Sequence, residues 1–263
     1  MSTVIRLNGV TLPGTGYLHI SQFLEIFVSV TDGLKGMYSF SSDENKSLIN
    51  YAGGQNLVKH GNIIFTENGV KLSKDNYFDT GIMPSAAGFT HIAVAIPKKP
   101  SAIDNGCFLV SNYFKPGGTG TGGQATGYVL AAANDPRFRN YVQVNANGWV
   151  YGNMGIRFLS DSTPAVWGGV ASVGSGSAGG TKVVYGYNNN LAIGNGGNVF
   201  AISIAGQGTK LIGGHRGPST EFNDETNYVQ AVLIYDRALS DVELNQVYQD
   251  LRQYGAGRGI TGL

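Results

Sequence analysis

Several features that are common in secreted, metal-binding or membrane proteins are scarce in this sequence. Cys107 is the only cysteine among 263 residues, which excludes an internal disulfide and a cysteine-rich zinc site. Charged residues make up 13% of the chain and the net charge is +1, so we expect no broad basic surface and no nucleic-acid partner. No apolar run approaches the roughly 20 residues that a membrane helix needs, and we expect no membrane insertion.

The start of the chain also lacks a secretory pattern. The stretch MSTVIRLNGVTLPGTG has no basic segment followed by a continuous apolar core. We therefore expect a protein that is made in the cytoplasm, carries no secretion signal and is not held together by disulfides.

Glycine and aromatic residues are plentiful instead. The chain has 40 glycines without a collagen-like period, and 11% of its residues are aromatic. From Asp32-Gly33 onward, short β-type segments such as FTHIAVAI and KVVYGYN alternate with glycine-rich turns and no helix intervenes. Asn-Gly pairs in Glu67-Asn68-Gly69 and Ala146-Asn147-Gly148 favour hairpins with type I′ turns. This pattern of short strands and glycine-rich turns predicts an all-β, antiparallel β-sandwich or jelly roll.

The end of the chain is the one stretch with a helical pattern. Ser240 and Glu243 have the spacing of a capping box, and Leu239 and Leu244 fit a hydrophobic staple. The residues that recur at helical spacing and form one apolar face are Leu244, Val247, Tyr248, Leu251 and Tyr254. Arg252 would lie in the last turn and Gly255 at the position just after the helix. We predict a helix that packs on the sheet, directly after a strand over 228–235.

This closing pattern resembles a known family. The run IYDRALS at 234–240, followed by the apolar helix, is similar to the last strand and helix of laminin-G-like, concanavalin A-like jelly rolls. Earlier segments, including LKGMYSF, GVKLSKDNYFDTGI and LIGGH, resemble that family in the same order. The resemblance covers roughly 33–254, so we divide the chain into an N-terminal extension or attachment segment, 1–32, and a jelly-roll domain, 33–263. It implies a lectin or adhesion fold but leaves function open, because the fold serves many activities.

Enzymatic and metal chemistry find little support in the residues. Glycosidases of this family use a Glu-x-Asp-x-x-Glu arrangement, and this spacing is absent here. Glu221, Asp224 and Glu225 form the nearest acidic cluster, which is either a solvated turn or a calcium or ligand loop. Two Gly-x-Gly-x-x-Gly matches open no helix and so lack a phosphate site. Calcium is therefore the one cofactor that stays open.

A glycan-binding site is the favoured hypothesis. A sugar site needs aromatic faces for C–H surfaces, and amide or charged groups for hydroxyls. The residues near predicted loops that offer such groups are Trp167, Tyr187, Asn188, Asn189, Asn190, His215, Arg216, Asn223 and Asp224. Two competing interpretations are that Trp167 belongs to the core, and that the asparagines are there because asparagine tolerates left-handed turns.

We therefore predict a non-enzymatic recognition or adhesion domain that binds a bacterial cell-surface glycan. The low charge and the Gly/Ser/Thr/Asn-rich loops are typical of a phage tail fibre or virion-surface protein, made in the host cytoplasm, with other virion proteins as partners and a homo-oligomer possible. A purely structural role in virion assembly or capsid decoration is the first alternative, and a glycan-cleaving enzyme is the second.

Overall fold

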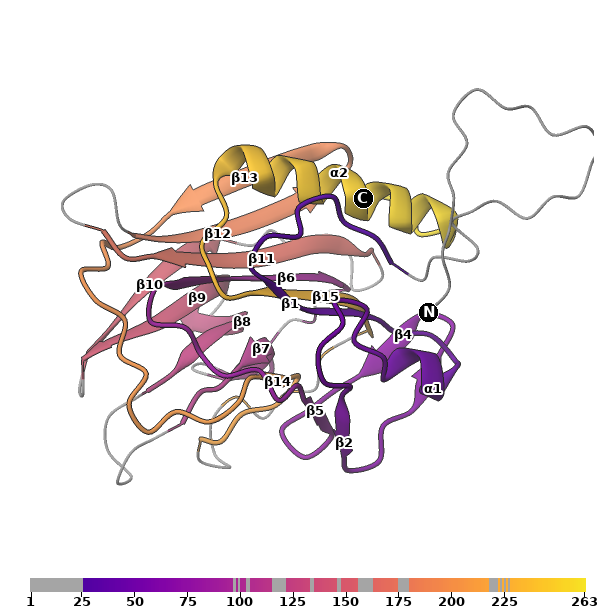
Figure 1. The fold of residues 1–263 in the computed structure, drawn as a ribbon, viewed down its shortest axis with the longest axis horizontal. Helices are drawn as coiled ribbons and strands as arrows, with labels where there is room; N and C mark the ends of the chain where they lie inside the picture. Colours follow the sequence, from indigo (N-terminus) through magenta and orange to yellow (C-terminus); the bar gives the residue numbers. More distant parts are fainter. Residues whose placement is uncertain are drawn as a thin grey trace, which may run out of the picture.

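The computed structural model describes residues 26–263 apart from 97, 99, 103–104, 115–121, 133–134, 146–147, 156–162, 175–179, 218–221, 223, 225 and 227. Within that part the chain forms two antiparallel sheets that face each other, with a C-terminal helix outside one of them (Figure 1). The predicted antiparallel sandwich with one C-terminal helix is thus confirmed; a single short helix, α1 (Glu44–Ser47), is the addition.

Sheet A has the strand order β13-β12-β11-β6-β15-β4-β3, and β1 pairs with β15 beside β4. Its strands are β1 (Leu34–Ser39), β3 (Phe65–Thr66), β4 (Gly69–Lys71), β6 (Gly88–Ala95), β11 (Ala165–Ser172), β12 (Gly180–Tyr187), β13 (Asn190–Asn195) and β15 (Tyr228–Tyr235).

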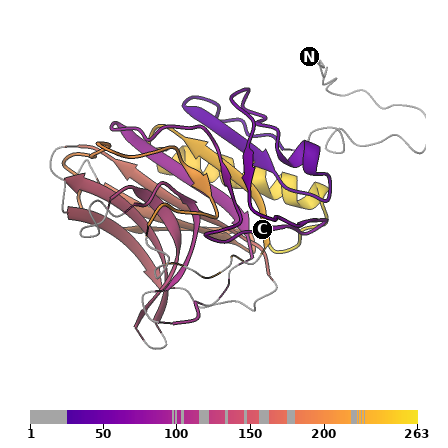
Figure 2. The same cartoon turned by 90° about the horizontal axis from the view of Figure 1, so that it is seen from below.

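Sheet B has the order β10-β9-β8-β7-β14-β5-β2. Its strands are β2 (Val58–His60), β5 (Tyr77–Asp79), β7 (Gly106–Ser111), β8 (Gln124–Ala132), β9 (Asp135–Asn145), β10 (Gly148–Gly155) and β14 (Leu211–Ile212). Figure 2 separates the same layers from below, with α2 (Asp241–Gly257) behind the strands.

The two faces of sheet A are both apolar, and the strand sequences show why. In β6, Ala93 and Ala95 pack into the core between the sheets, whereas Ile92 and Val94 pack on the opposite face under α2. Side chains alternate between faces of a strand, so a continuous apolar run supplies two cores at once. This explains why the central strands β6 and β15 carry apolar residues at consecutive positions rather than only at alternate ones.

The helix begins as the sequence predicts. Ser240 accepts a hydrogen bond from the Glu243 amide, and the Glu243 carboxylate accepts one from the Ser240 amide, which completes the capping box. Leu244, Val247 and Leu251 are buried on the sheet. Such a cap stabilises a helix by about 1 kcal/mol, so most of the helix stability comes from this packing.

The helix end differs from the prediction. α2 continues to Gly257, so Gly255 is a helical residue and Arg252 is not in the last turn. A Cβ on Gly255 would lie 2.5 Å from Leu263 Cδ1, and Gly259 takes the left-handed conformation at φ +70° instead. The chain turns at Gly259, four residues past the expected position, and the Ile260 amide closes the turn by donating to the Gly255 carbonyl at 2.8 Å.

Hairpin predictions were correct in place, and one differs in turn type. β3 and β4 join through Glu67 and Asn68, neither of which has a positive φ, while Gly69 has φ +100°. The left-handed residue therefore follows the two-residue turn, which excludes a type I′ turn there. β9 and β10 pair as a hairpin, but the residues of its turn at 146–147 lie outside the described part.

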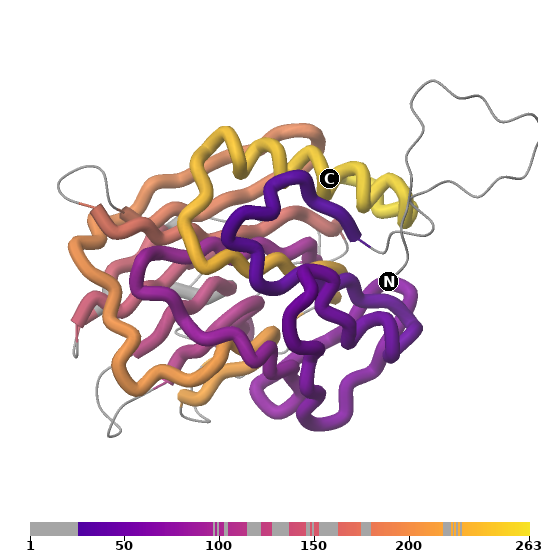
Figure 3. The backbone as a smooth tube through the Cα atoms, in the orientation of Figure 1, coloured from indigo at the N-terminus to yellow at the C-terminus, as the bar shows by residue number. Residues whose placement is uncertain are grey.

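The described end of the predicted extension packs on the domain. Ile26 and Val28 are buried in the cluster under α2, and both the amide and the hydroxyl of Ser29 donate to Asp250 Oδ2 at 2.7 Å. Figure 3 shows this segment running alongside the helix. Residues 26–32 therefore join the same packed unit, and the role assigned to 1–32 stays a prediction.

Candidate functional site

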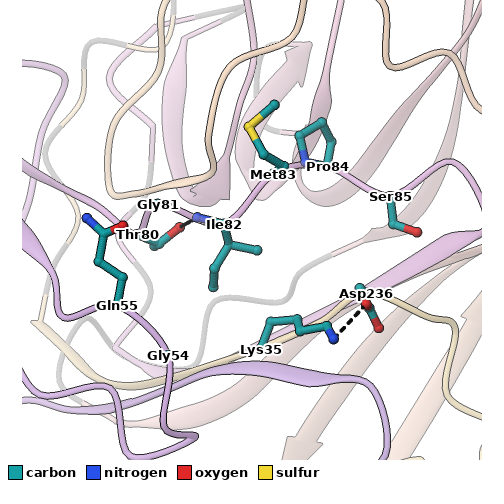
Figure 4. A pocket seen from close by; sticks show the side chains of 10 residues that line it. All are labelled: Lys35, Gly54, Gln55, Thr80, Gly81, Ile82, Met83, Pro84, Ser85 and Asp236. Atoms are coloured by element: carbon teal, nitrogen blue, oxygen red, sulfur yellow. Dashed lines mark hydrogen bonds and ion pairs between the residues drawn. The ribbon is translucent and has the colours of Figure 1, made fainter.

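A cleft of about 530 Å³ opens at the rim of the sandwich, and we call it the rim cleft. Four segments that are distant in sequence form it: Lys35 at the start of β1, Gly54 and Gln55, the stretch 80–85 after β5, and Asp236 after β15 (Figure 4). We call residues 80–85 the cleft wall. The cleft lies where sheet A ends against the loop that leaves sheet B.

One side of the rim cleft carries exposed charges. Lys35 Nζ lies 3.1 Å from Asp236 Oδ2, with side-chain exposures of 51% and 38%. An ion pair this exposed adds little to stability, because water and salt screen it. Both groups are therefore free to exchange their mutual contact for contacts with a polar ligand.

The opposite side combines an amide with an apolar surface. Gly81 has φ +68°, and a Cβ there would lie 2.4 Å from Gln55 Oε1, so only glycine lets the exposed Gln55 side chain lie this close. Ile82 is half-buried and Met83 is 59% exposed. Binding sites for small ligands commonly combine an apolar surface with a few fixed polar groups, which matches this lining.

A charged ledge adjoins the wall. Asp79 Oδ1 accepts a hydrogen bond from the Gly81 amide at 3.0 Å, and Oδ2 accepts from Thr209 Oγ1 at 2.9 Å and from Arg216 Nη2 at 3.2 Å. Arg216 also donates to the Thr209 carbonyl. The ledge of Asp79, Thr209 and Arg216 thus fixes the first residues of the wall and brings the predicted Arg216 beside the rim cleft.

A buried polar network supports the wall from inside. Lys210 is 0% exposed, and its Nζ lies 2.6 Å from His91 Nε2 and 2.7 Å from Gln124 Oε1. Burial lowers the pKa of the Lys210 ammonium to about 7, against a smaller opposing effect of Asp236. Burial, and then the nearby Lys210, hold the pKa of His91 well below its ordinary value.

His215 lies on the face of sheet B that points away from sheet A. It is 6% exposed and packs edge-on against Phe108 and Tyr113, with ring centroids 5.8 and 5.6 Å away. The Phe222 ring covers Phe108, with ring centroids 4.3 Å apart, so this part of the face is closed to solvent.

The far edge of the same sheet carries an exposed aromatic residue. Tyr151 is 46% exposed beneath Arg139, whose guanidinium lies 5.0 Å from the ring centroid.

Asp224, a further predicted ligand-binding residue in the loop between β14 and β15, makes hydrogen bonds within the protein. Asp224 Oδ2 accepts a hydrogen bond from the Ser101 amide at 2.8 Å, and the Asp224 amide donates to Gly106. Asn223 and the acidic neighbours Glu221 and Glu225 lie outside the described residues. The calcium hypothesis for that loop therefore stays a prediction.

Trp167 is a core residue. It is 3% exposed, its indole N–H donates to the Ala95 carbonyl at 3.2 Å, and its ring lies 5.1 Å from Phe138 across the sandwich. The indole therefore has no face on which a sugar could stack. The core interpretation of this residue, rather than the ligand interpretation, agrees with its placement.

The asparagine run makes a hairpin. Asn188 and Asn189 have φ of +49° and +63° and connect β12 to β13, which is the turn geometry that favours asparagine and glycine. Tyr187, half-buried, stacks on Tyr185 at 6.3 Å, and Asn190 begins β13. These residues belong to sheet A, whereas His215 and Arg216 follow β14 of sheet B. Because Trp167 is buried in the core, the predicted residues that the structure describes do not all lie on one surface.

The sequence reasoning missed most of the rim cleft. Lys35, Gln55, Met83 and Asp236 come from four separate segments, and only their meeting makes a site. One weak signal was available: the pattern Gly-x-x-Pro at Gly81 and Pro84 indicates an exposed turn directly after a strand. Lys210 gave none, because a single lysine beside an apolar run has no feature that indicates burial.

The described residues contain neither a metal-binding cluster nor a membrane-spanning helix. No group of three His, Cys, Asp or Glu side chains in that part of the chain is placed to hold a metal ion. Nor is any of its helices both long and apolar enough to cross a membrane.

Comparison with known proteins identifies structures of the same fold. No protein-family model and no curated protein sequence matches this chain. One match is a structure of botulinum neurotoxin type C, a toxin whose cell entry is described as dependent on interaction with two ganglioside molecules. Its TM-score is 0.53 at 12% sequence identity, and the match covers 84% of this chain and 52% of the toxin chain. The chain thus spans about half the length of that toxin chain.

Two further matches come from carbohydrate-active proteins. Domain 4 of AbnA, an extracellular arabinanase from Geobacillus stearothermophilus in complex with arabinotriose, has a TM-score of 0.55 at 13% identity and covers 82% of this chain and 98% of its own. Trypanosoma rangeli sialidase in complex with sialic acid has a TM-score of 0.53 at 16% identity over 85% of this chain and 34% of its own. At these identities the likeness establishes the β-sandwich fold.

Proposed function

We propose that this protein is a non-enzymatic recognition domain that binds a cell-surface glycan in the rim cleft. The observation that carries the proposal is the lining itself: the exposed Lys35–Asp236 pair lies on one side, and the Gln55 amide with the apolar side chains of Ile82 and Met83 lies on the other. Sugar hydroxyls would replace the mutual contact of the ion pair, and C–H surfaces would lie on the apolar side.

The comparisons support this proposal at the level of fold. The toxin structure is described with gangliosides and the arabinanase domain with arabinotriose, so the same sandwich occurs in proteins that contact carbohydrate. The sialidase match takes in 34% of the enzyme chain, which leaves most of that enzyme without a counterpart here. Binding rather than catalysis is therefore the activity we assign to this chain.

Mutation of the rim cleft tests the proposal. Glycan-array binding followed by calorimetry should show specific binding by the unaltered protein, and Gln55→Ala and Asp236→Asn should each weaken it about tenfold, the equivalent of one hydrogen bond of ~1.4 kcal/mol. Asp75→Asn, at a carboxylate that is 82% exposed and paired with Lys74 outside the cleft, is the matched control and should bind normally.

Four results would overturn the proposal or replace it with an alternative. Absence of binding to every glycan tested, or binding that neither cleft variant weakens, removes the assigned site. Release of sugar from a host polysaccharide would replace binding with catalysis, and stable oligomers without glycan binding would favour the assembly alternative.

The placement of this domain on a phage tail or virion surface is a further part of the proposal. It rests on composition alone: few charges, no disulfide and many small polar loop residues. Tail or capsid genes beside this one, and detection of the chain in purified particles by mass spectrometry, are the expected results. A gene neighbourhood without virion proteins would remove this placement and leave the rim cleft as proposed.

A further inference from the structure

Lys210 is a buried amine without an acidic hydrogen-bond partner. Its two acceptors, His91 and Gln124, are neutral, and Nζ lies 4.7 Å from the centre of the Phe89 ring. None of the ion pairs found among the described residues includes Lys210. A neutral amine has two N–H groups, which equals the number of acceptors. The third N–H of an ammonium would meet the Phe89 ring, a cation–π contact that offsets only part of the cost of burying the charge.

The hydrogen-bond chain fixes the state of His91. Thr126 Oγ1 donates to Asn140 Oδ1 at 3.0 Å, and Asn140 Nδ2 donates to the Val170 carbonyl at 2.8 Å. The Thr126 hydroxyl must then accept from His91 Nδ1, 3.0 Å away, so Nδ1 carries the imidazole proton and Nε2 is the acceptor for Lys210. His91 is thus neutral.

The network leaves little room for rearrangement. The chain from Lys210 to Val170 crosses between the sheets through β6, β8, β9 and β11. A Cβ on Gly169 would lie 2.4 Å from Asn140 Oδ1, so a glycine makes space for that amide. A second proton on His91 would face Lys210 at 2.6 Å, which a buried site disfavours strongly.

The same residues hold both ends of the cleft wall. The Lys210 amide donates to the Ile82 carbonyl at 2.8 Å, and the Thr80 amide and hydroxyl donate to the Lys210 carbonyl at 3.1 and 2.8 Å. Gln124 Nε2 donates to the Ser85 carbonyl at 2.7 Å while its Oε1 accepts from Lys210. A displacement of Lys210 or Gln124 therefore moves the wall.

We propose that Lys210, with His91 and Gln124, is a proton-dependent latch that positions the wall of the rim cleft. With the amine neutral, every N–H has an acceptor and the wall is held. Proton uptake buries a charge whose cost is relieved when Lys210 shifts toward the cleft, which loosens 80–85 through the two backbone hydrogen bonds and the Thr80 hydroxyl bond to Lys210.

The pH at which the latch responds follows from the surroundings of Lys210. Burial brings the pKa of Lys210 to about 7, so the latch operates near neutral pH. The titratable side chain that faces it is His91 on β6; Gln124 and Thr126 on β8 and Asn140 on β9 do not titrate. At the rim, Asp236 is paired with Lys35 and Asp79 with Arg216, so both carboxylates already have cationic partners.

Hydrogen exchange tests the latch without any ligand. When opening exposes Lys210, the open state binds a proton that the closed state lacks above pH 7, so protection of the 80–85 amides, corrected for intrinsic exchange, should rise by up to about tenfold per pH unit between pH 7 and 9. It should be flat below pH 6. Residues 252–257 at the end of α2 open by fraying and should show no such dependence.

Variants separate positioning from general stability. Lys210→Met should abolish the pH dependence of 80–85, and Gln124→Glu, which adds a carboxylate beside Nζ, should shift it to higher pH. Lys182→Met, at a lysine paired with Asp241 on the opposite side of sheet A, is the control and should keep it. If Lys210→Met does not fold, a titration of ¹³Cε-labelled lysines in the unaltered protein decides the question.

Three outcomes overturn the latch: Lys210 titrating with the exposed lysines near 10.5, protection of 80–85 independent of pH, or a pH dependence that survives Lys210→Met. The importance of the latch for ligands rests on the proposed function, but its test does not. If glycan binding fails but the hydrogen-exchange result is as expected, the proposed ligand is ruled out and the latch is kept.

Discussion

Arg237 and Glu243 form a two-pronged ion pair that joins the turn after β15 to the first turn of α2. Arg237 Nη2 lies 2.6 Å from Glu243 Oε1, and Nη1 lies 3.1 Å from Oε2. The same carboxylate accepts the Ser240 amide at 2.8 Å. One side chain therefore caps the helix and fixes its direction relative to the strand before it, which places the apolar face of α2 on sheet A.

This pairing predicts an acid-sensitive contribution to stability. The hydrogen bonds from Arg237, and then from the Ser240 amide, lower the pKa of Glu243 from 4.5 to about 2. Because the folded pKa is the lower one, the contribution is complete above pH 4.5 and is lost as the pH falls toward 2. Glu243→Gln should destabilise the protein by about 1 kcal/mol at pH 7, and the difference should vanish near pH 2, as measured by thermal unfolding. Asp241→Asn in the same turn is the control; an equal pH profile for both variants would contradict the assignment.

Trp167→Ala should act on stability rather than on ligand binding. The indole is buried between the sheets, and truncation of such a side chain typically costs about 3–5 kcal/mol. Urea unfolding should show this loss, with Trp167→Phe losing less. A variant that keeps its stability but loses glycan binding would return Trp167 to the binding site.

The β12–β13 hairpin should depend on left-handed backbone rather than on the asparagine side chains. Asn189 has φ +63°, a conformation that costs other L-residues roughly 1–2 kcal/mol. Asn189→Ala should therefore lower the free energy of unfolding by about 1 kcal/mol, and Asn189→Gly should leave it nearly unchanged. A binding assay on both variants would show whether the turn also contacts ligand: equal binding by Asn189→Gly and the unaltered protein is the expected result.

Two glycines with similar φ should respond differently to alanine. Gly69 and Gly53 have φ of +100° and +87°, but a Cβ on Gly69 would lie 2.2 Å from the Val229 carbonyl oxygen, whereas nothing lies within 4 Å of one on Gly53. Gly53→Ala should cost only the backbone strain of about 1 kcal/mol. Gly69→Ala must also displace β15 and should cost clearly more by thermal unfolding; equal losses would mean that the β3–β4 hairpin yields without disturbing β15.

The helix and the short strands could be predicted from the sequence because each depends on residues that are close together in the chain. The spacing of Ser240 and Glu243, the apolar repeat after them and the short glycine-bounded strands are local signals, and all of them reappear in the structure. The predictions for the turn at Gly69 and for the helix end were wrong, and at both places a segment distant in sequence packs closely on the chain: β15 against Gly69 and Leu263 against Gly255.

The candidate site is the opposite case. Of the nine residues chosen from the sequence, Arg216 lies on the ledge beside the rim cleft, while Trp167 is in the core and Asn188 and Asn189 form a turn. Composition and local spacing determined that this chain is a low-charge antiparallel sandwich closed by one helix, since strand alternation and capping act over a few residues. Only the tertiary structure decided that Lys35, Gln55, the cleft wall and Asp236 meet, and that Lys210 lies buried between neutral partners, because the position of a side chain between two sheets depends on strands far apart in the sequence.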